Sequence, residues 1–113
     1  MLYKRVNKEI ELLKEKYNIL NYSENYNEII IHIDYDNIKI ILNDHYPFKP
    51  PKMYINDIDY IQYLVNLQNT KADKLKELDE ICLCCKTILC HNNWKPAFKI
   101  TQIIDEYDRF NLI

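Results

Sequence analysis

The stretch Tyr46–Ile55, YPFKPPKMYI, restricts the fold more than any other part of the sequence. Its three prolines, at positions 47, 50 and 51, exclude an α-helix and a central β-strand. Proline lacks a backbone N–H and disfavours helical geometry in the residue before it. We therefore expect a stiff, extended crossing, followed by a short strand at Lys52–Ile55.

The residues before this stretch predict a helix and then an antiparallel sheet. Residues 2–16 have apolar side chains at helical spacing and Lys and Glu on the opposite face, which predicts an amphipathic helix. The runs EIIIHIDY (28–35) and IKIILN (38–43) flank a short Asp/Asn turn and predict a hairpin. YNILNY (17–22) adds a first strand, so we expect a meander of about four strands. The apolar positions of the helix are Leu2, Val6, Ile10 and Leu13.

Glycine is absent from the chain, which constrains how its turns are built. A turn that needs a positive φ is normally made by glycine, and Asn and Asp are the next residues to tolerate it. The sequence is rich in both, so we expect Asn and Asp at such positions.

The residues after the proline stretch predict further helices. Ile58, Ile61, Leu64 and Val65 indicate one helical segment. TKADKLKELDEI (70–81), with Leu75 and Leu78, indicates a second, and Thr70 with Asp73 has the spacing of a capping box. A C-terminal helix is expected from Ala97 to Phe110. Its apolar stripe consists of Ile100, Ile103, Ile104, Tyr107 and Phe110.

These elements predict one α+β domain over residues 1–113: an N-terminal helix, an antiparallel meander, an irregular cysteine-containing segment and a C-terminal helix. The formal net charge of -2 gives no electrostatic basis for binding nucleic acid or an anionic membrane. No apolar run approaches the roughly 20 residues of a membrane span, and the charged start is unlike a signal peptide. We therefore expect a cytoplasmic or nuclear protein without nucleic-acid or membrane partners.

All four cysteines lie in CLCCKTILCH (82–91). In a reducing compartment such a cluster suggests metal ligands or reactive thiols before disulfides. One hypothesis is a zinc site made by Cys82, Cys85, Cys90 and His91, in which case the chain would be a zinc-stabilised interaction module. Against it, all four ligands would come from ten residues, and neighbouring Cys90 and His91 would have to converge on one ion. The alternatives are small, buried apolar roles for Cys82, Cys84 and Cys90, or a single working thiol.

Three motifs together resemble the ubiquitin-conjugating enzyme family. YPFKPPKMYI is similar to the proline-rich stretch between that family's third and fourth strands. WKPAFKITQII (94–104) is similar to its Trp-Ser-Pro-Ala segment, with Lys95 in place of serine, and LYKRVNKEI (2–10) is similar to its first helix. The resemblance covers residues 1–55 and 82–110 and implies a minimal UBC-like domain.

The resemblance also implies an activity. The family's nucleophile opens a Cys-x-x-Ile-Leu motif shortly before the tryptophan, and Cys85–Leu89 fits that motif. Cys85 would carry ubiquitin or a ubiquitin-like protein as a thioester, receive it from an activating enzyme and pass it to a lysine, with a ligase. Lys86 would lower the pKa of this thiol, and no cofactor is needed.

Partner contacts follow from the same resemblance. Phe48, Lys49, Pro96 and Ala97 fall where the family's two ligase-contact loops lie, and exposed apolar residues there would act as anchors. Arg5 and Lys8 fall on the helix face that the family offers to its activating enzyme and ligases. A solvated charged face is the plainer interpretation of that helix.

The chain departs from the family pattern in three places. The His-Pro-Asn tripeptide before the cysteine is missing, and Asn92 and Asn93 are the candidates to supply its asparagine. Losing one such oxyanion donor typically costs about 10²–10³ in rate. The segment between the proline stretch and the cysteines is longer than usual, and the chain ends at Ile113, before the family's last two helices. The missing tripeptide and the short C-terminus favour the alternative of a non-catalytic relative that binds ubiquitin or another partner as an adaptor or decoy.

Overall fold

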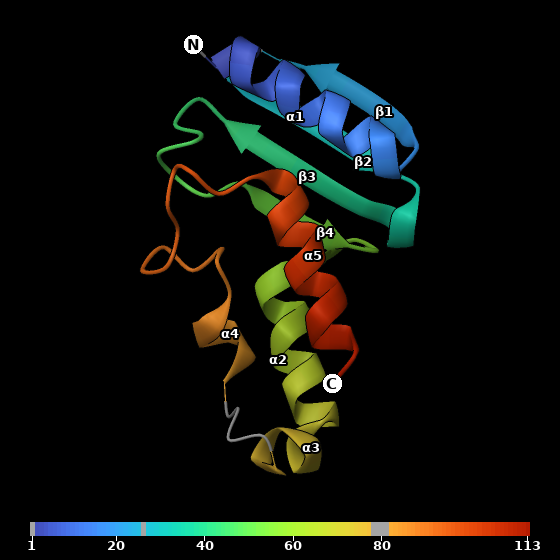
Figure 1. Cartoon of the computed structure of the whole chain (residues 1–113), viewed down its shortest axis with the longest axis vertical. Helices are drawn as coiled ribbons and strands as arrows, with labels where there is room; N and C mark the ends of the chain where they lie inside the picture. The colour runs from blue at the N-terminus through green and yellow to red at the C-terminus, as the bar shows by residue number, and fades with distance from the viewer. Residues whose placement is uncertain (1, 26, 78–81) are drawn as a thin grey trace.

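The computed structural model describes residues 2–25, 27–77 and 82–113 as an α+β domain with one antiparallel sheet (Figure 1). Its principal-axis extents are 43 × 28 × 22 Å, with the sheet and the first helix at one end of the long axis and the remaining helices towards the other. The elements, in chain order, are α1 (Leu2–Lys16), β1 (Ile19–Glu24), β2 (Glu28–Ile33), the 3-10 turn η1 (Tyr35–Asn37), β3 (Ile38–Asn43), β4 (Lys52–Ile55), β5 (Ile58–Asp59), α2 (Tyr60–Thr70), α3 (Ala72–Glu77), α4 (Leu83–Lys86) and α5 (Ile100–Asn111).

The sheet is a simple meander in the order β1-β2-β3-β4-β5. In β2 and β3 the buried side chains alternate with more exposed ones, as expected for strands with one face against a core. Ile31 lies opposite Ile40 across this hairpin, and Ile40 lies opposite Met53 across β3 and β4. The predicted hairpin and the strand Lys52–Ile55 are confirmed, and β5 adds a two-residue edge to the four predicted strands.

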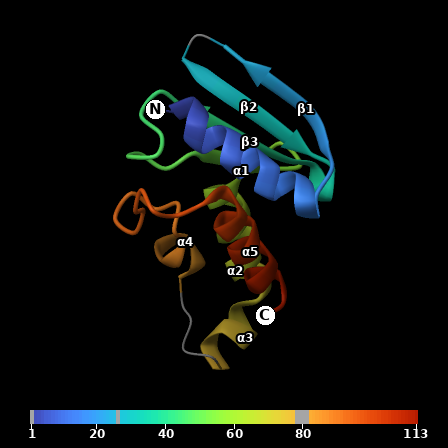
Figure 2. The same ribbon diagram turned by 45° about the horizontal axis from the view of Figure 1, so that its top comes forward.

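Helix α1 lies across one face of the sheet, as both views show (Figures 1 and 2). Val6 and Leu13, two turns apart, are fully buried in the same core as the sheet residues. The predicted helix 2–16 is thus confirmed with its boundaries. Helices α2 and α5 lie side by side beyond the sheet. Hydrogen bonds of 2.9 Å (Tyr60 to Glu106) and 2.5 Å (Tyr63 to Asn111) join them.

Each positive-φ residue of the described chain is Asn or Asp, as expected for a sequence without glycine. They are Asp36, Asn37, Asn56 and Asp57. The second pair forms the tight turn that joins β4 to β5, so Ile58 pairs with Ile55 in the sheet. The prediction that Ile58 belongs to the following helix is therefore wrong.

Three other boundaries also differ from the prediction. Helix α2 starts at Tyr60, because the Asp59 carboxylate accepts from the backbone N–H groups of the first turn. Thr70 does not cap a second helix, since it is the last residue of α2 and its hydroxyl donates to the Asn66 carbonyl at 3.0 Å. The second helix begins at Ala72 and buries Leu75, while Leu78 lies outside the described residues.

The last helix begins at Ile100 instead of Ala97, because the Gln102 side chain accepts from the Lys99 N–H at 2.7 Å and caps it there. Its predicted apolar stripe is buried throughout. The proline stretch begins as a series of turns over residues 44–48, has no regular secondary structure at Pro50 and Pro51, and ends in β4. The expectation of an extended crossing is therefore wrong for its first half.

Candidate functional site

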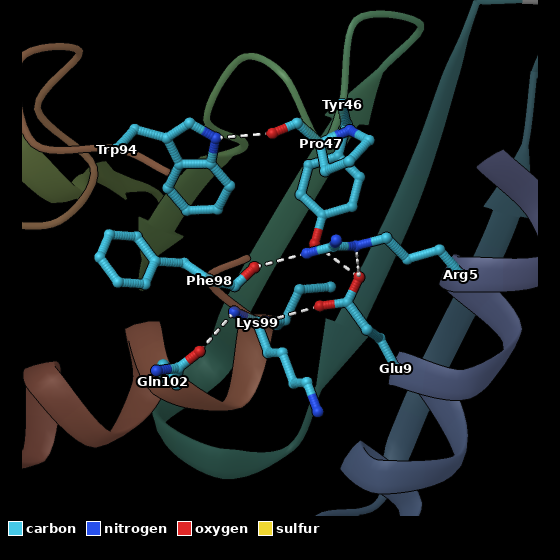
Figure 3. A network of polar contacts seen from close by, with 9 residues as sticks. Arg5, Glu9, Tyr46, Pro47, Trp94, Phe98, Lys99 and Gln102 are labelled. Carbon is cyan, nitrogen blue, oxygen red and sulfur yellow. Dashed lines mark hydrogen bonds and ion pairs between the residues drawn. The ribbon is translucent and has the colours of Figure 1, made fainter. Parts of the chain in front are cut away.

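The proline stretch and the tryptophan segment meet in space, although they are far apart in sequence (Figure 3). The Trp94 indole N–H donates to the Pro47 carbonyl at 2.7 Å. The Trp94 ring also lies against Tyr46, with centroids 6.2 Å apart, and against Phe98 at 5.7 Å. The two loops that hold these residues are therefore fixed to one another.

A buried carboxylate, Glu9 of α1, supports the same junction. Its side chain is 3% exposed and accepts from the Tyr46 hydroxyl at 2.5 Å and from the Ile100 N–H at 2.8 Å. Burial and this carboxylate raise the pKa of Tyr46, so its phenol stays protonated and donates. Glu9 thus connects the first helix, the proline stretch and the start of α5.

Arg5 belongs to this network instead of standing free on the helix surface. Its guanidinium donates to the Phe98 carbonyl at 2.6 Å, pairs with Glu9 at 3.4 Å and lies 5.4 Å from the centre of the Tyr46 ring. Lys8, the other residue expected to contact partners, is exposed. Arg5 and Lys8 line one surface groove, together with Lys4, Glu9, Glu11, Leu12, Glu15 and Lys99.

A second buried carboxylate, Glu106 of α5, holds the chain next to the cysteines. It is 1% exposed and accepts from the Thr87 hydroxyl at 2.6 Å, the Ile88 N–H at 2.8 Å and the Tyr60 hydroxyl at 2.9 Å. Two of these donors directly follow the short helix α4. Glu106 therefore fixes the backbone just after Cys85 relative to α2 and α5.

Asn93 holds the other side of this loop. Its side-chain amide donates to the carbonyl of Cys85 at 2.8 Å and to that of Thr87 at 3.0 Å, so both amide hydrogens are used on the backbone. Asn92 is exposed. Asn93, which was expected to help an oxyanion, thus holds the backbone of Cys85, the expected nucleophile.

The structure brings three thiols together: Cys82, Cys84 and Cys85. Cys82 Sγ lies 2.7 Å from Cys85 Sγ and 3.1 Å from Cys84 Sγ, and all three sulfurs lie within 4.8 Å of one another. All four cysteines are free thiols; Cys85 is exposed and the other three are half-buried. The prediction that Cys82, Cys84 and Cys90 are buried is therefore wrong, while the exposure expected of Cys85 is confirmed.

The thiols perturb one another's ionisation. Hydrogen bonds from Cys85 and Cys84 stabilise the Cys82 thiolate and lower the pKa of Cys82. The hydrogen bond to Cys82 is in turn the main cause that raises the pKa of Cys85 to about 11. This is opposite to the direction predicted from Lys86. The most readily ionised of the three thiols is therefore Cys82.

These three cysteines could hold a metal ion, but they are not the set predicted from the sequence. Cys84 takes part, whereas Cys90 and His91 do not join the group. The reason is local geometry: Cys82 directly precedes α4 and Cys84 and Cys85 lie within it, so one helical turn gathers their side chains.

The four residues expected to contact a ligase are at the surface. Phe48 is 79% exposed, and Lys49, Pro96 and Ala97 are exposed as well. A hydrogen bond from Trp94 to Pro47 joins the two loops that carry them.

Neither Glu9 nor Glu106 is among the site residues predicted from the sequence. The spacing of the sequence nevertheless indicates both residues. Glu9 is three residues after Val6 and four before Leu13, so it lies on the apolar face of its helix. Glu106 has the same relation to Ile103 and Phe110. A carboxylate within an apolar helical stripe indicates a buried acceptor with specific donors.

No family model, curated protein or solved structure matches this chain. Among the described residues, no helix has the length and apolar character to cross a membrane.

Proposed function

We propose that this chain is a divergent ubiquitin-conjugating-like domain that carries ubiquitin or a ubiquitin-like modifier as a thioester on Cys85. The observation that supports this most is that the Cys85 thiol is exposed while the backbone around it is held by hydrogen bonds. Asn93 donates a hydrogen bond to the carbonyl of Cys85. Glu106 accepts hydrogen bonds from Thr87 and Ile88, which lie two and three residues after Cys85. The two segments that most resemble the family also contact one another, through Trp94 and Pro47.

The chemistry asks little of the protein beyond position. The Cys85 thiolate attacks the carbonyl carbon of the modifier's thioester on the activating enzyme; a new C–S bond forms and that enzyme's thiolate leaves. A neutral substrate amine then attacks the Cys85 thioester, an amide bond forms, the Cys85 thiolate leaves, and the proton that the amine loses passes to solvent. The bound thioester is already activated, so holding the reacting groups in place supplies much of the acceleration.

The raised pKa of Cys85 sets a condition on loading. At neutral pH little of this thiol is ionised, because its pKa is about 11. A thiol with a higher pKa gives a more nucleophilic thiolate once ionised, and this offsets part of the effect of the small ionised fraction. We therefore expect loading to accelerate as the pH rises above neutrality.

Partners are assigned to two surfaces in this proposal. The exposed Phe48, Lys49, Pro96 and Ala97 receive the ligase, because apolar side chains on fixed loops anchor a partner at low entropic cost. The groove along α1, with Lys8, receives the activating enzyme. No metal or cofactor takes part in the transfer.

One observation favours the alternative, a non-catalytic relative that binds ubiquitin or another partner. Both amide hydrogens of Asn93 are bound to backbone carbonyls, which leaves none for an oxyanion at Cys85. A binding-only protein retains its affinity for the modifier in Cys85→Ala and forms no covalent adduct.

The test is to incubate the reduced protein with activating enzyme, ATP and ubiquitin, and to separate the products with and without thiol. The proposal expects an adduct that thiol cleaves. Cys85→Ser loses this thiol-sensitive adduct, and Cys90→Ser, the matched control in the same loop, retains it. Absence of any adduct, or its survival in Cys85→Ser, contradicts the catalytic proposal.

A further inference from the structure

The convergence of three sulfurs is not needed to carry a thioester, which uses one. Cys82 lies 2.7 Å from Cys85 and 3.1 Å from Cys84, measured between sulfurs, and all three sulfurs lie within 4.8 Å of one another. Cys82 directly precedes the short helix α4, and Cys84 and Cys85 lie in its single turn, which brings their side chains to one place.

The turn that holds these thiols is fixed from several sides. Leu83 is fully buried, and its N–H donates to the Gln68 side chain of α2 at 2.9 Å. On the other side Asn93 holds the Cys85 carbonyl. The backbone that carries the three cysteines is therefore held in place before any ligand binds, which lowers the entropic cost of binding.

The donor set selects a class of ligand. Thiolates are soft ligands, which favour Cu(I) and Zn(II) and disfavour Mg(II) and Ca(II). No carboxylate or imidazole of the described residues joins the three sulfurs. Structural zinc sites have four protein ligands as a rule, so three thiolates match a cation that accepts three-fold coordination.

The sulfur spacing is compatible with such an ion. Metal–sulfur bonds of about 2.3 Å in a trigonal arrangement place the sulfurs about 4 Å apart, by simple geometry. The separations of the Cys82 sulfur from those of Cys85 and Cys84 are shorter, so these side chains turn outwards to admit the ion. Binding releases the thiol protons.

We propose that Cys82, Cys84 and Cys85 bind one soft monovalent cation of the Cu(I) class through three thiolates. The inference does not rest on the proposed function, because Cys84 and Cys82 have no part in carrying a modifier. The two are linked at one atom, since a Cys85 sulfur bound to metal is not available for a thioester. A metal-loaded protein is therefore resistant to charging.

The experiment uses the full chain, reduced and freed of reductant under nitrogen, and titrated with Cu(I) against a chromophoric Cu(I) chelator. We expect about one Cu(I) per chain, with ultraviolet thiolate-to-metal absorption. Cys84→Ala is the decisive variant and Cys90→Ala the matched control. Removing a supporting residue of a metal site typically costs 10–100-fold in affinity, and removing the ligand Cys84 is expected to cost at least about as much.

The results that overturn the proposal are equally defined. They are wild-type affinity in Cys84→Ala, an equal loss in Cys90→Ala, or displacement of Cu(I) by an equal concentration of Zn(II). Circular dichroism establishes that each variant is folded. Charging of Cys84→Ala with ubiquitin separates the two proposals: it is retained if the thioester proposal holds, whatever the outcome of the metal titration.

Discussion

Glu9 and Glu106 are the buried carboxylates of the described chain, and each joins segments that are distant in sequence. Each accepts from three donors, and among the described residues no buried side-chain nitrogen or oxygen lacks a partner. The carboxylates therefore define the geometry of the junction and of the cysteine loop, because a buried acceptor is costly unless its donors are in place.

Replacing Glu106 tests this role. In Glu106→Ala the buried donors of Thr87, Ile88 and Tyr60 lose their acceptor. We expect the free energy of unfolding to fall by about 2–4 kcal/mol, since each unsatisfied buried group costs about 1–3 kcal/mol. Urea denaturation measures the loss. Glu106→Gln should lose less, and the exposed neighbour in Asp105→Ala should change by less than about 0.5 kcal/mol. Equal losses in the Glu106→Ala and Asp105→Ala variants contradict this role.

The thiols give a second prediction at this scale. In the native protein at pH 8, an alkylating reagent should modify Cys82 before Cys85, because the pKa of Cys82 is lowered and that of Cys85 is raised. In Cys82→Ala the main cause of the raised value is gone, so the pKa of Cys85 falls towards its ordinary 9.0. A larger thiolate fraction at pH 8 then speeds alkylation of Cys85.

Peptide mapping by mass spectrometry measures both rates, and Cys90→Ala is the control. An unchanged Cys85 rate in Cys82→Ala contradicts the coupling between the two sulfurs. Single-residue features of this kind are only partly predictable. The Asn and Asp residues at positive φ follow from the missing glycine, whereas the coupling of Cys82 with Cys84 and Cys85 depends on the exact path of one turn.

At the scale of elements, local patterns predict what local forces determine. The helix at 2–16 and the hairpin have strong periodicity, and their apolar faces are buried as the patterns indicate. The errors lie where two local signals compete. Ile58 fits the apolar spacing of the following helix, but the turn at Asn56 and Asp57 returns it to the sheet. Thr70 has the spacing of a helix cap relative to Asp73, but it is the last residue of α2 and does not start the next helix.

This difference has a direct test. Asp59 accepts from the Ile61 and Gln62 N–H groups, so Asp59→Ala should lower the free energy of unfolding by about 1 kcal/mol. Thr70→Ala should change it by less than about 0.5 kcal/mol, since the exposed hydroxyl only bonds back to Asn66. Chemical denaturation of the two variants distinguishes the caps. A greater loss in Thr70→Ala assigns the helix start to the residue that the sequence pattern favoured.

At the scale of the whole molecule, the sheet with α1 and the helical part with the cysteines meet at the junction of Tyr46, Trp94 and Glu9 (Figure 3). The sequence indicates that the proline and tryptophan segments belong together only through their resemblance to a family. Their contact spans 47 residues, and periodicity carries no information at that distance.

Variants of Arg5 and Lys8 distinguish a residue that stabilises the fold from a residue that contacts a partner. Arg5→Ala removes the bond to the Phe98 carbonyl and the pairing with Glu9, and should lower the free energy of unfolding by about 1.5–3 kcal/mol. Lys8→Ala should leave stability within about 0.5 kcal/mol. If Lys8 contacts the activating enzyme, its variant slows charging without any change in the unfolding curve. A stable Arg5→Ala protein contradicts the role of Arg5 in the junction.

The central claim is that Cys85 alone among the four cysteines accepts the modifier. The most direct measurement is the mass of the ubiquitin adduct formed with activating enzyme and ATP, followed by mapping of the attached cysteine. We predict one thiol-cleavable adduct on Cys85, present in Cys90→Ser and absent in Cys85→Ser. An adduct on another cysteine, or no adduct on a protein that still binds ubiquitin, would contradict the claim.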